Sequence, residues 1–336
     1  MNILLSGGAG YIGSHTSIAL ALSGHNVTIF DNLSNSSLTT INALKEILGK
    51  DISFVQGDIL DTSLIKSTLN NYSIDGVIHL AGLKSVGDSI IKPMSYYETN
   101  LLGSLSLLKA INEVGIKYMV FSSSANVYGD PKYLPIDEIH PVAPTNPYGR
   151  TKLQVEHILE DLCKADRHLK VVNLRYFNPV GAHESGLVGE NPKGVANNLM
   201  PFITRVATNE LSALEVFGGD YDTLDGTGVR DFIHVMDLAE GHVAALNYLP
   251  KMLGFETFNL GNGIGYTVLQ MIQSFEKVSG VKIAYKIVNK RTGEISSSYA
   301  SPTKANLLLG WKAYRTIDDM CSSAWNFSKN LKKHQK

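Results

Sequence analysis

The sequence predicts an α/β fold: a Rossmann-type, doubly wound parallel sheet with a smaller, mixed α/β substrate domain. Three observations lead to this fold class. A glycine-rich turn follows the first apolar strand, strands and amphipathic helices then alternate through the first half of the chain, and polar side chains stand where several strands end. Ligands bind beyond the carboxyl ends of the strands in such sheets, so we expect the site at that edge.

The composition is that of an ordinary globular protein. Of 336 residues, 44% are apolar and 18% are charged, and the formal net charge is −1. A net charge near zero argues against nucleic acid or an anionic membrane as a partner. No apolar run approaches the ~20 residues of a transmembrane helix. The first residues lead straight into a glycine loop and do not resemble a signal peptide, so we expect a cytoplasmic protein.

The first element is a strand–turn–helix–strand unit. The strand Asn2–Ser6 runs into the turn Gly7 to Gly13, a helix is expected from Ser14 to about Ser23, and a second strand, Asn26–Phe30, ends at Asp31. Glycines let the backbone approach a pyrophosphate, and the helix N-terminus favours its charge. The unit therefore predicts dinucleotide binding, and the carboxylate of Asp31 favours NAD over NADP because it would repel a 2′-phosphate.

The units that follow extend the sheet. The apolar runs predict strands over 52–56, 76–80, 118–122 and 171–175, and a long helix over about 96–114. Alternation of this kind implies parallel strands joined by helical crossovers. Ala81 to Lys84 and Ser122 to Ser124 then lie at carboxyl ends of strands, where an active site is expected.

A helix after Pro147 carries the candidate catalytic pair. Proline suits the first helical position, and either Thr145 or Asn146 can cap the helix. Tyr148 and Lys152 stand four residues apart, so they share one helix face. An ammonium ~5 Å away at an effective dielectric of ~20 would favour the phenolate by roughly 3 kcal/mol, or about two pKa units. That would bring the tyrosine near working pH, as an acid–base group requires.

Ser124 completes the predicted centre. A serine-rich strand end is common in itself, but here it precedes the Tyr148–Lys152 helix in a dinucleotide-binding sheet. A Ser/Tyr/Lys set at one edge of a nicotinamide site is the signature of hydride transfer. Histidine and cysteine point to no metal: His79, His234 and His242 lack partners at ligand spacing, and Cys163 and Cys321 are far apart and read as helix packing residues.

From residue 177 onward the sequence pattern changes to mixed strands, loops and polar clusters. We expect a strand over 214–218, a helix start at Asn197 to Pro201, and loops that carry Arg230 and Arg291. Arginine forks suit phosphate. Taken alone, however, a loop arginine is usually a solvated charge.

Long motifs in a fixed order cover nearly the whole chain. They are GGAGYIGSHT from Gly7, DNLSNS from Asp31, AGLKSVGDS from Ala81, SSSANVYGD from Ser122, LRYFNPVGAH from Leu174, NNLMP from Asn197 and DGTGVRDFIHVMDLAEGHV from Asp225. With these motifs the sequence resembles the extended short-chain dehydrogenase/reductase family, and within it the bacterial UDP-glucose/UDP-galactose 4-epimerases. The resemblance implies an NAD-binding domain over 1–179 and a UDP-sugar-binding domain over 180–336, with some interleaving of the chain.

The resemblance also assigns residues. It implies that Tyr148 takes the proton of the sugar 4-hydroxyl with help from Ser124, that the 4-hydride passes to NAD, and that Lys152 holds the nicotinamide ribose. The residues implied for NAD are Gly7, Gly10, Tyr11, Ile12, Gly13, Asp31, Asn32, Leu33, Ser34, Asn35, Ser36, Asp58, Ile59, Leu80, Ala81, Gly82, Leu83, Lys84, Thr99, Ser124, Tyr148, Lys152 and Phe177. Those implied for the UDP-sugar are Lys84, Ser124, Tyr148, Asn178, Asn197, Asn198, Leu199, Leu214, Val216, Phe217, Arg230, Arg291, Glu294 and Ser298.

Two other functions remain as alternatives. A nucleotide-sugar 4,6-dehydratase would need an acid pair after the first hydroxyl, usually Thr-Asp-Glu, where this chain has Ser124-Ala125-Asn126. A non-catalytic NAD-sensing regulator would share the fold, since fold does not fix function. Such regulators typically lose the tyrosine or the lysine, and this chain keeps both.

Departures from the family pattern bear on specificity and assembly. Asn126 and Thr99 replace a usual threonine and asparagine. Ser298 occupies a position where relatives restricted to plain hexoses tend to have tyrosine, so the sequence predicts acceptance of UDP-GlcNAc and UDP-GalNAc as well; alternatively, Tyr299 swings into the same space. The resemblance further implies a homodimer formed through the helices of about 96–114 and 148–165.

Overall fold

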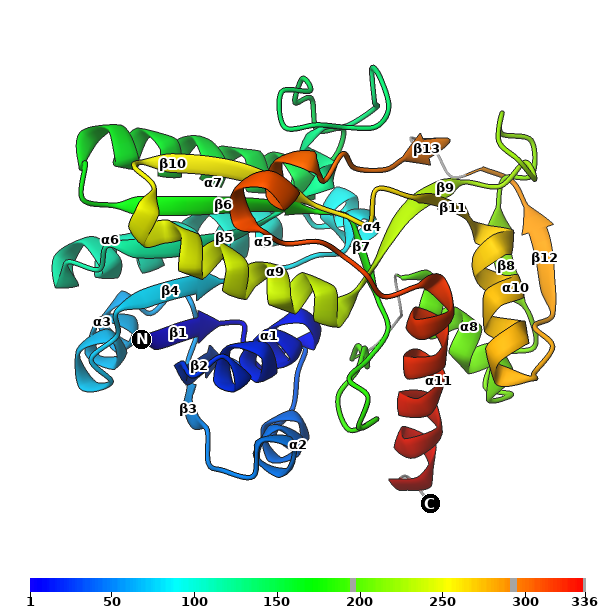
Figure 1. Ribbon diagram of the computed structural model, residues 1–336, viewed down its shortest axis with the longest axis horizontal. Helices are drawn as coiled ribbons and strands as arrows, with labels where there is room; N and C mark the ends of the chain where they lie inside the picture. The colour runs from blue at the N-terminus through cyan, green and yellow to red at the C-terminus, as the bar shows by residue number, and fades with distance from the viewer. Residues whose placement is uncertain (194–197, 291–294, 335–336) are drawn as a thin grey trace.

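A seven-stranded parallel sheet forms the centre of the molecule (Figure 1). The computed structural model describes residues 1–193, 198–290 and 295–334. The sheet order is β3-β2-β1-β4-β5-β6-β10, which is the doubly wound Rossmann order with one added strand. Its strands are β1 Asn2–Ser6, β2 Asn26–Asp31, β3 Ser53–Gln56, β4 Gly76–His79, β5 Tyr118–Ser124, β6 Lys170–Tyr176 and β10 Phe255–Leu260.

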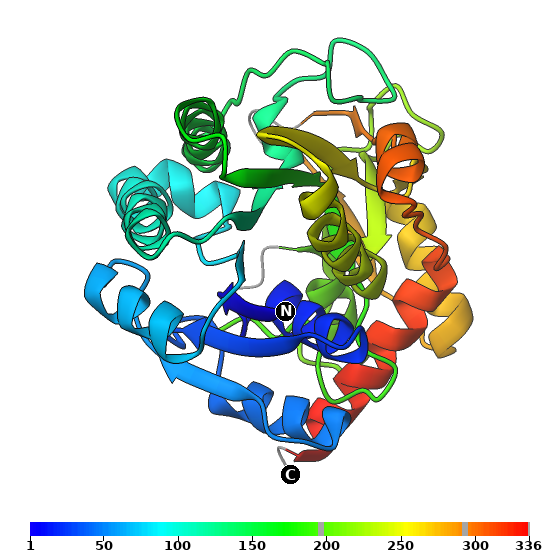
Figure 2. The ribbon, with the colours of Figure 1, turned by 60° about the vertical axis from the view of Figure 1, so that its left-hand side comes forward.

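Helices cover both faces of this sheet (Figure 2). Their bounds are α1 Tyr11–Leu22, α2 Leu38–Leu48, α3 Thr62–Asn71, α4 Val86–Ile91, α5 Pro93–Tyr96, η1 Tyr97–Leu102, α6 Gly103–Val114, η2 Ala125–Val127, α7 Pro147–Ala165, α9 Val235–Tyr248 and η3 Leu249–Lys251. Apolar residues of α1, α2 and α9 pack in one core on one face. Those of α3, α6 and α7 pack in a second core on the other face. In α7 the spacing is four, as with Val155 and Leu159, so one stripe of the helix faces the strands.

Apart from η4 Ala305–Leu309, which packs on α9 and β10 of the larger part, the remaining elements form the smaller part of the molecule, at the right of Figure 1. They are β7 Asn178–Val180, α8 Leu199–Ala207, β8 Leu214–Phe217, β9 Val229–His234, β11 Gly265–Thr267, α10 Val268–Ser279, β12 Tyr285–Val288, β13 Ser297–Ser298 and α11 Ile317–His334. Strand β9 pairs with β7, β11 and β13, and β8 pairs with β12. A third core joins α8, α10 and α11 to these strands.

The sequence-predicted elements agree with the structure, apart from some boundaries and one loop. Helix α1 begins at Tyr11, three residues before the predicted start, because the helix opens inside the glycine turn. The sequence predicts a loop at Arg230, but this residue lies on β9, where it pairs in register with Tyr266 of β11. A residue on a strand that is paired with its neighbours has a fixed backbone. The position of Arg230 is therefore better defined than that of a loop residue.

The chain also interleaves between its two parts. Helix α9 packs on α1, and β10 then pairs with β6 in the first sheet. Residues well beyond 180 therefore complete the Rossmann sheet. The division of ligand binding near residue 179 stays a prediction. None of the helices within the described ranges is both long and apolar enough to cross a membrane.

Candidate active site

The turn between β1 and α1 leaves no room for a side chain at Gly7 or Gly13. Gly7 has φ +74°, and a Cβ there would lie 2.7 Å from the Ala81 nitrogen. A Cβ on Gly13 would lie 2.3 Å from the Gly7 carbonyl oxygen. Helix α1 thus begins with bare backbone directly beside the Ala81 turn, as binding of a pyrophosphate at a helix N-terminus requires.

Asp31 is held against this turn at the end of β2. Its Oδ2 accepts from the Ala9 amide at 3.1 Å, and its Oδ1 accepts from the Leu33 amide at 2.8 Å and from Ser36 Oγ at 2.9 Å. The carboxylate is therefore oriented beside the glycine backbone. A fixed carboxylate in that place can accept ribose hydroxyls.

The neighbouring strand end closes the same side of the sheet. Asn32 Nδ2 donates to Asp58 Oδ2 at 3.0 Å, and Asn32 Oδ1 accepts from the Ser34 amide at 3.0 Å. Asn35 Oδ1 accepts from the Lys193 amide at 3.2 Å, and Ile59 is buried. The structure thus brings the predicted residues of 31–36 and 58–59 together.

A residue that the sequence reasoning missed shapes the turn after β4. Asn100 is buried in η1; its Oδ1 accepts from the Leu83 amide at 2.7 Å, and its Nδ2 donates to the Leu83 carbonyl at 3.0 Å and to Thr151 Oγ1 at 3.1 Å. It therefore fixes the backbone of Leu80 to Lys84 and ties it to α7. An asparagine in a helix interior is unfavourable by propensity, which is the signal that could have found it.

Lys84 extends from this turn toward the smaller part of the molecule. Its Nζ lies 2.8 Å from Glu190 Oε1, and the same oxygen accepts from Asn198 Nδ2 at 2.6 Å. Glu190 was not singled out from the sequence. Tyr11 also bridges the two parts, because its hydroxyl donates to the Gly181 carbonyl at 2.7 Å.

Helix α7 presents the predicted catalytic pair to the end of β5. Asn146 rather than Thr145 caps the helix, since its Oδ1 accepts from the Gly149 amide at 2.8 Å, and Pro147 is the first helical residue. Tyr148, Lys152 and Ser124 are all buried. Lys152 Nζ donates to the Ser122 carbonyl at 2.7 Å and stands 5.0 Å from the Phe121 ring centre.

The protonation of this pair differs from the sequence expectation. Burial raises the pKa of Tyr148, while a hydrogen bond with Ser124 acts in the opposite direction. Burial lowers the pKa of Lys152 to about 8, and Glu156 opposes that shift. The spacing predicted the shared helix face correctly, but that face is turned away from water, so each group is disfavoured in its charged form.

The predicted sugar-side residues lie on adjacent strands of the smaller sheet. Ser298 of β13 pairs in register with Arg230 of β9, and Asn178 of β7 pairs with Phe232, two residues further along β9. Phe177 is buried just before β7. The Tyr299 ring packs beside Gly265, and Ser298 is buried at the end of β13.

Other predicted substrate residues are placed less directly. Asn198 precedes α8 and Leu199 begins it, as expected. Leu214 and Val216 are buried in the third core, so a ligand could meet only their backbone, while Phe217 is partly exposed. Asn197, Arg291 and Glu294 lie outside the described residues.

The histidines named from the sequence have structural partners. His79 shares hydrogen bonds with Ser6 Oγ at 2.7 Å and Ser104 Oγ at 2.9 Å. His234 bonds Ser323 Oγ at 3.0 Å, and His242 bonds the Leu238 carbonyl at 2.9 Å. Across the described ranges, no three His, Cys, Asp or Glu side chains gather so that they could hold a metal ion.

Comparisons with known proteins agree on one family. The family described as GDP-mannose 4,6 dehydratase matches residues 4–324. The UDP-glucose 4-epimerase of Bacillus subtilis is 51% identical over 327 residues, which are 97% of this chain and 96% of the relative. The UDP-glucose-4-epimerase of Stenotrophomonas maltophila, solved with NAD and formylated UDP-arabinopyranose, superposes with a TM-score of 0.98 at 45% identity, covering 99% of both chains. The UDP-glucose 4-epimerase of Bifidobacterium longum, solved with NAD+ and UDP, superposes with a TM-score of 0.95 at 48% identity, covering 98% of both chains.

Proposed function

The chain belongs to the UDP-glucose 4-epimerases of the extended short-chain dehydrogenase/reductase family, and from this we propose that it interconverts UDP-glucose and UDP-galactose with bound NAD. The observation that carries the proposal is the buried set of Tyr148, Lys152 and Ser124 beside the glycine turn. A family match over nearly the whole chain and the buried catalytic set support the same reaction.

The residues around the glycine turn fit NAD. Gly7 and Gly13 let the turn, the start of α1 and the Ala81 backbone pack closely, which leaves backbone amides at the helix N-terminus for a pyrophosphate, and Asp31 suits an unphosphorylated ribose. When bound, NAD supplies a hydride acceptor for the sugar C4 and can return the hydride. We assign its binding to residues 7–13, 31–36, 58–59 and 80–84, together with Thr99, Ser124, Tyr148, Lys152 and Phe177.

We assign to Tyr148 the removal of the proton from the sugar 4-hydroxyl. Its phenolate and the Lys152 ammonium are each disfavoured by burial, but opposite charges one helical turn apart stabilise each other. The Ser124 hydroxyl further favours the phenolate. The pair can therefore hold the proton on Tyr148 while the 4-keto sugar exists, and return it to the sugar 4-oxygen when the hydride is delivered to the other face of C4.

We assign binding of the nucleotide end of the substrate to the smaller part of the molecule. Arg230 suits the diphosphate through its fork geometry, and the same role falls to Arg291 from the resemblance. The other positions assigned to the UDP-sugar are Lys84, Asn178, Asn197, Asn198, Leu199, Leu214, Val216, Phe217 and Glu294. Binding energy far from C4 leaves the sugar free to turn between the two hydride transfers.

Product analysis tests this function against the dehydratase alternative. Purified protein incubated with UDP-galactose should yield UDP-glucose of the same mass. A 4,6-dehydratase would yield a product lighter by one water, but Ser124-Ala125-Asn126 provides no carboxylate for that elimination. A non-catalytic NAD-binding regulator would leave the substrate unchanged. Either of these results would overturn the proposal.

We also propose that the enzyme accepts UDP-GlcNAc and UDP-GalNAc. Ser298 is small and buried beside Arg230, and a serine leaves room for an acetamido group where a phenol ring would clash. Ser298→Tyr is expected to lower kcat/KM for UDP-GlcNAc by at least tenfold, with little effect on UDP-galactose, because steric exclusion of a buried group costs about 1–3 kcal/mol. Ser297→Tyr, on the opposite face of β13, is the matched control. A wild type inert toward UDP-GlcNAc would refute the idea.

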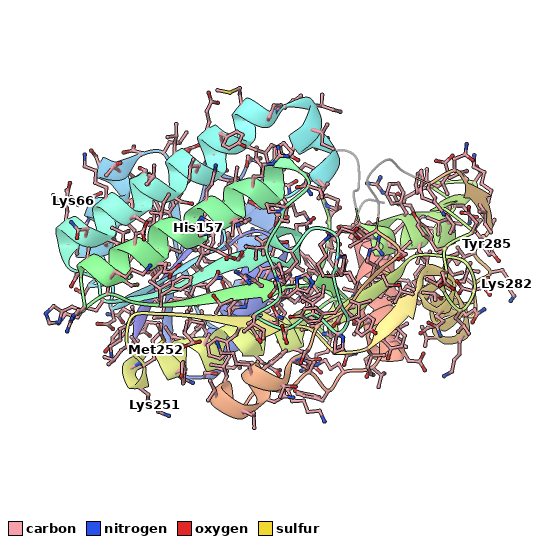
Figure 3. All side chains as sticks on the ribbon, turned by 90° about the horizontal axis from the view of Figure 1, so that it is seen from above. Lys66, His157, Lys251, Met252, Lys282 and Tyr285 are labelled. Carbon is pink, nitrogen blue, oxygen red and sulfur yellow. The ribbon has the colours of Figure 1, made fainter. Side chains whose placement is uncertain are left out.

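A homodimer through the outer faces of η1–α6 and α7 is a further proposal. Figures 2 and 3 show the two helices side by side, with His157 on the outer side of α7. Leu102 is 51% exposed and Leu105 is 41% exposed on the same surface. Sedimentation should give twice the chain mass, and Leu105→Glu should shift the equilibrium toward monomer. A wild type that stays monomeric at every concentration would reject the dimer.

We assign the enzyme to the cytoplasm. Cys163 and Cys321 are both buried and unpaired, which suits a reducing compartment. Cell fractionation with an antibody to the chain would test this.

A further inference from the structure

A buried ion pair stands directly behind the catalytic residues. Glu156 lies one helical turn beyond Lys152 on α7, on the face that also carries Tyr148. Its carboxylate receives Arg175 Nη2 at 2.6 Å and Arg175 Nε at 3.1 and 3.2 Å, and it also accepts from Ser123 Oγ. Glu156 is 3% exposed and Arg175 is 8% exposed.

The contacts of this pair alternate with those of the catalytic residues along β5. Ser123 and Arg175 are partners in the β5–β6 register, so one carboxylate binds both strands at the same level. The residue before Ser123 supplies the carbonyl that receives Lys152 Nζ, and the residue after it, Ser124, lies where its hydroxyl lowers the pKa of Tyr148. Three successive residues of β5 therefore meet three successive turns of one helix face.

The network continues from Arg175 toward the sugar side. Arg175 Nη1 donates to the Tyr128 hydroxyl at 3.2 Å, and that hydroxyl donates to Asn259 Oδ1 of β10 at 2.7 Å. Asn259 Nδ2 donates to the Ile136 carbonyl at 3.0 Å, and the Ile136 amide donates to the Tyr299 carbonyl at 2.9 Å. An unbroken hydrogen-bond path thus joins the catalytic helix to the segment that follows Ser298.

Stability alone is a poor reason for such a pair. Removing two charges from water is expensive, and apolar residues of similar volume often hold a helix on a sheet as well or better. A carboxylate that receives a two-point contact from a guanidinium, however, fixes distance and direction more narrowly than apolar packing does. The arrangement is therefore better explained by placement of the catalytic residues than by stability.

We propose that Glu156, through Arg175 and Ser123, is a positioning residue of the epimerisation reaction: it fixes α7 against the ends of β5 and β6, so that Lys152 stays on the Ser122 carbonyl and Tyr148 stays opposite Ser124. The inference rests on the proposed function and names a residue that acts on its catalytic set from behind. Glu156 itself reaches neither substrate nor cofactor in this role, because its carboxylate is occupied by Arg175 and Ser123.

The surroundings of Lys152 give the inference a readout that a merely structural role would not move. The titratable groups around it on α7, β4 and β6 are Tyr148, Glu156, His79, Arg175 and Tyr176. Burial holds the pKa of His79 at about 3 and raises the pKa of Tyr176, so these two groups are uncharged near neutrality. Besides Tyr148, its partner in the reaction, the charged groups named around Lys152 are then the Glu156–Arg175 ion pair.

Glu156→Gln tests the inference by removing the negative charge and keeping the size. We expect kcat for UDP-galactose to fall by roughly 10–100-fold, as for a small misplacement of catalytic groups, with KM changed less than threefold. In wild type, activity that needs the Lys152 ammonium should decline as pH rises through about 8. In the variant the Arg175 guanidinium has no carboxylate partner and disfavours the Lys152 ammonium. The alkaline limb of the pH–activity profile, where activity falls as pH rises, should therefore move to lower pH.

A matched control and a second variant make the test decisive. Asp237 is also fully buried and paired with an arginine, Arg315, but it lies on α9, so Asp237→Asn should lower Tm without moving kcat or the alkaline limb. If Glu156→Gln does not fold, the double variant Glu156→Met with Arg175→Met carries the test, since it leaves no buried charge unpaired. Its kcat should still fall at least tenfold.

Wild type assayed in parallel separates this inference from the proposed function. Wild type without epimerase activity would overturn both. If wild type is active, two results would overturn only the positioning role. One is a Glu156→Gln variant whose kcat and alkaline limb match those of wild type. The other is a double variant whose kcat matches that of wild type.

Discussion

Replacing Tyr148 with phenylalanine is expected to lower kcat by roughly 10²–10⁴-fold, because the change removes the acid–base group. The ring should keep its place, since Tyr148 is buried and packs edge-on against Tyr96 with centroids 6.5 Å apart. Fold and NAD content should therefore persist. Steady-state kinetics, circular dichroism and NAD released on denaturation check these three expectations.

A tyrosine outside the site provides the control for this change. Tyr133 is 43% exposed and its hydroxyl donates to Asp137 Oδ1 at 2.7 Å. Tyr133→Phe removes the same atom from the same side chain and should leave kcat unchanged. Full activity in Tyr148→Phe would show that another group takes the proton.

Replacing Lys152 with methionine should have an effect of similar size. The ammonium is the charge that favours the Tyr148 phenolate, and its loss should lower kcat by about 10²-fold or more. Bound NAD should also be lost more readily, because Lys152 is assigned to the nicotinamide ribose. The unfolding temperature should change little, since burial already opposes the charge and methionine fits the slot beside Phe121.

Lys170 is a close match for this experiment. Its Nζ also donates to a carbonyl, that of Pro250 at 2.9 Å, and stands over an aromatic ring, that of Tyr118, at 6.0 Å. It lies at the opposite end of the sheet, at the start of β6. Lys170→Met should retain kcat within about twofold; equal losses in both variants would assign the Lys152 effect to general destabilisation.

Local chemistry made much of the fold predictable. Glycines before α1, proline at the start of α7 and apolar spacing within each helix are signals carried by neighbouring residues, so the order of the Rossmann strands could be anticipated. The glycines before Arg230 dominate the local pattern, so the sequence predicts a loop there. Its position on β9 depends on strands β7, β11 and β13, which come from distant parts of the chain.

The site was less predictable where buried partners decide the chemistry. Helical spacing put Tyr148 and Lys152 on one face, but only the packing of α7 on the sheet shows that burial raises the pKa of one and lowers that of the other. Asn100 and the Glu156–Arg175 pair act through contacts across 17 and 19 residues of sequence. No short motif records such partners, because each depends on how elements pack.

The central claim is that C4 is inverted by a hydride that leaves and returns within one active site. UDP-galactose carrying deuterium at C4, incubated with purified protein and no added NAD, tests it directly, with the product analysed by NMR and mass spectrometry. We expect UDP-glucose that keeps the deuterium at C4. Product that has exchanged the label for solvent hydrogen, or no turnover until a nicotinamide cofactor is added, would contradict it.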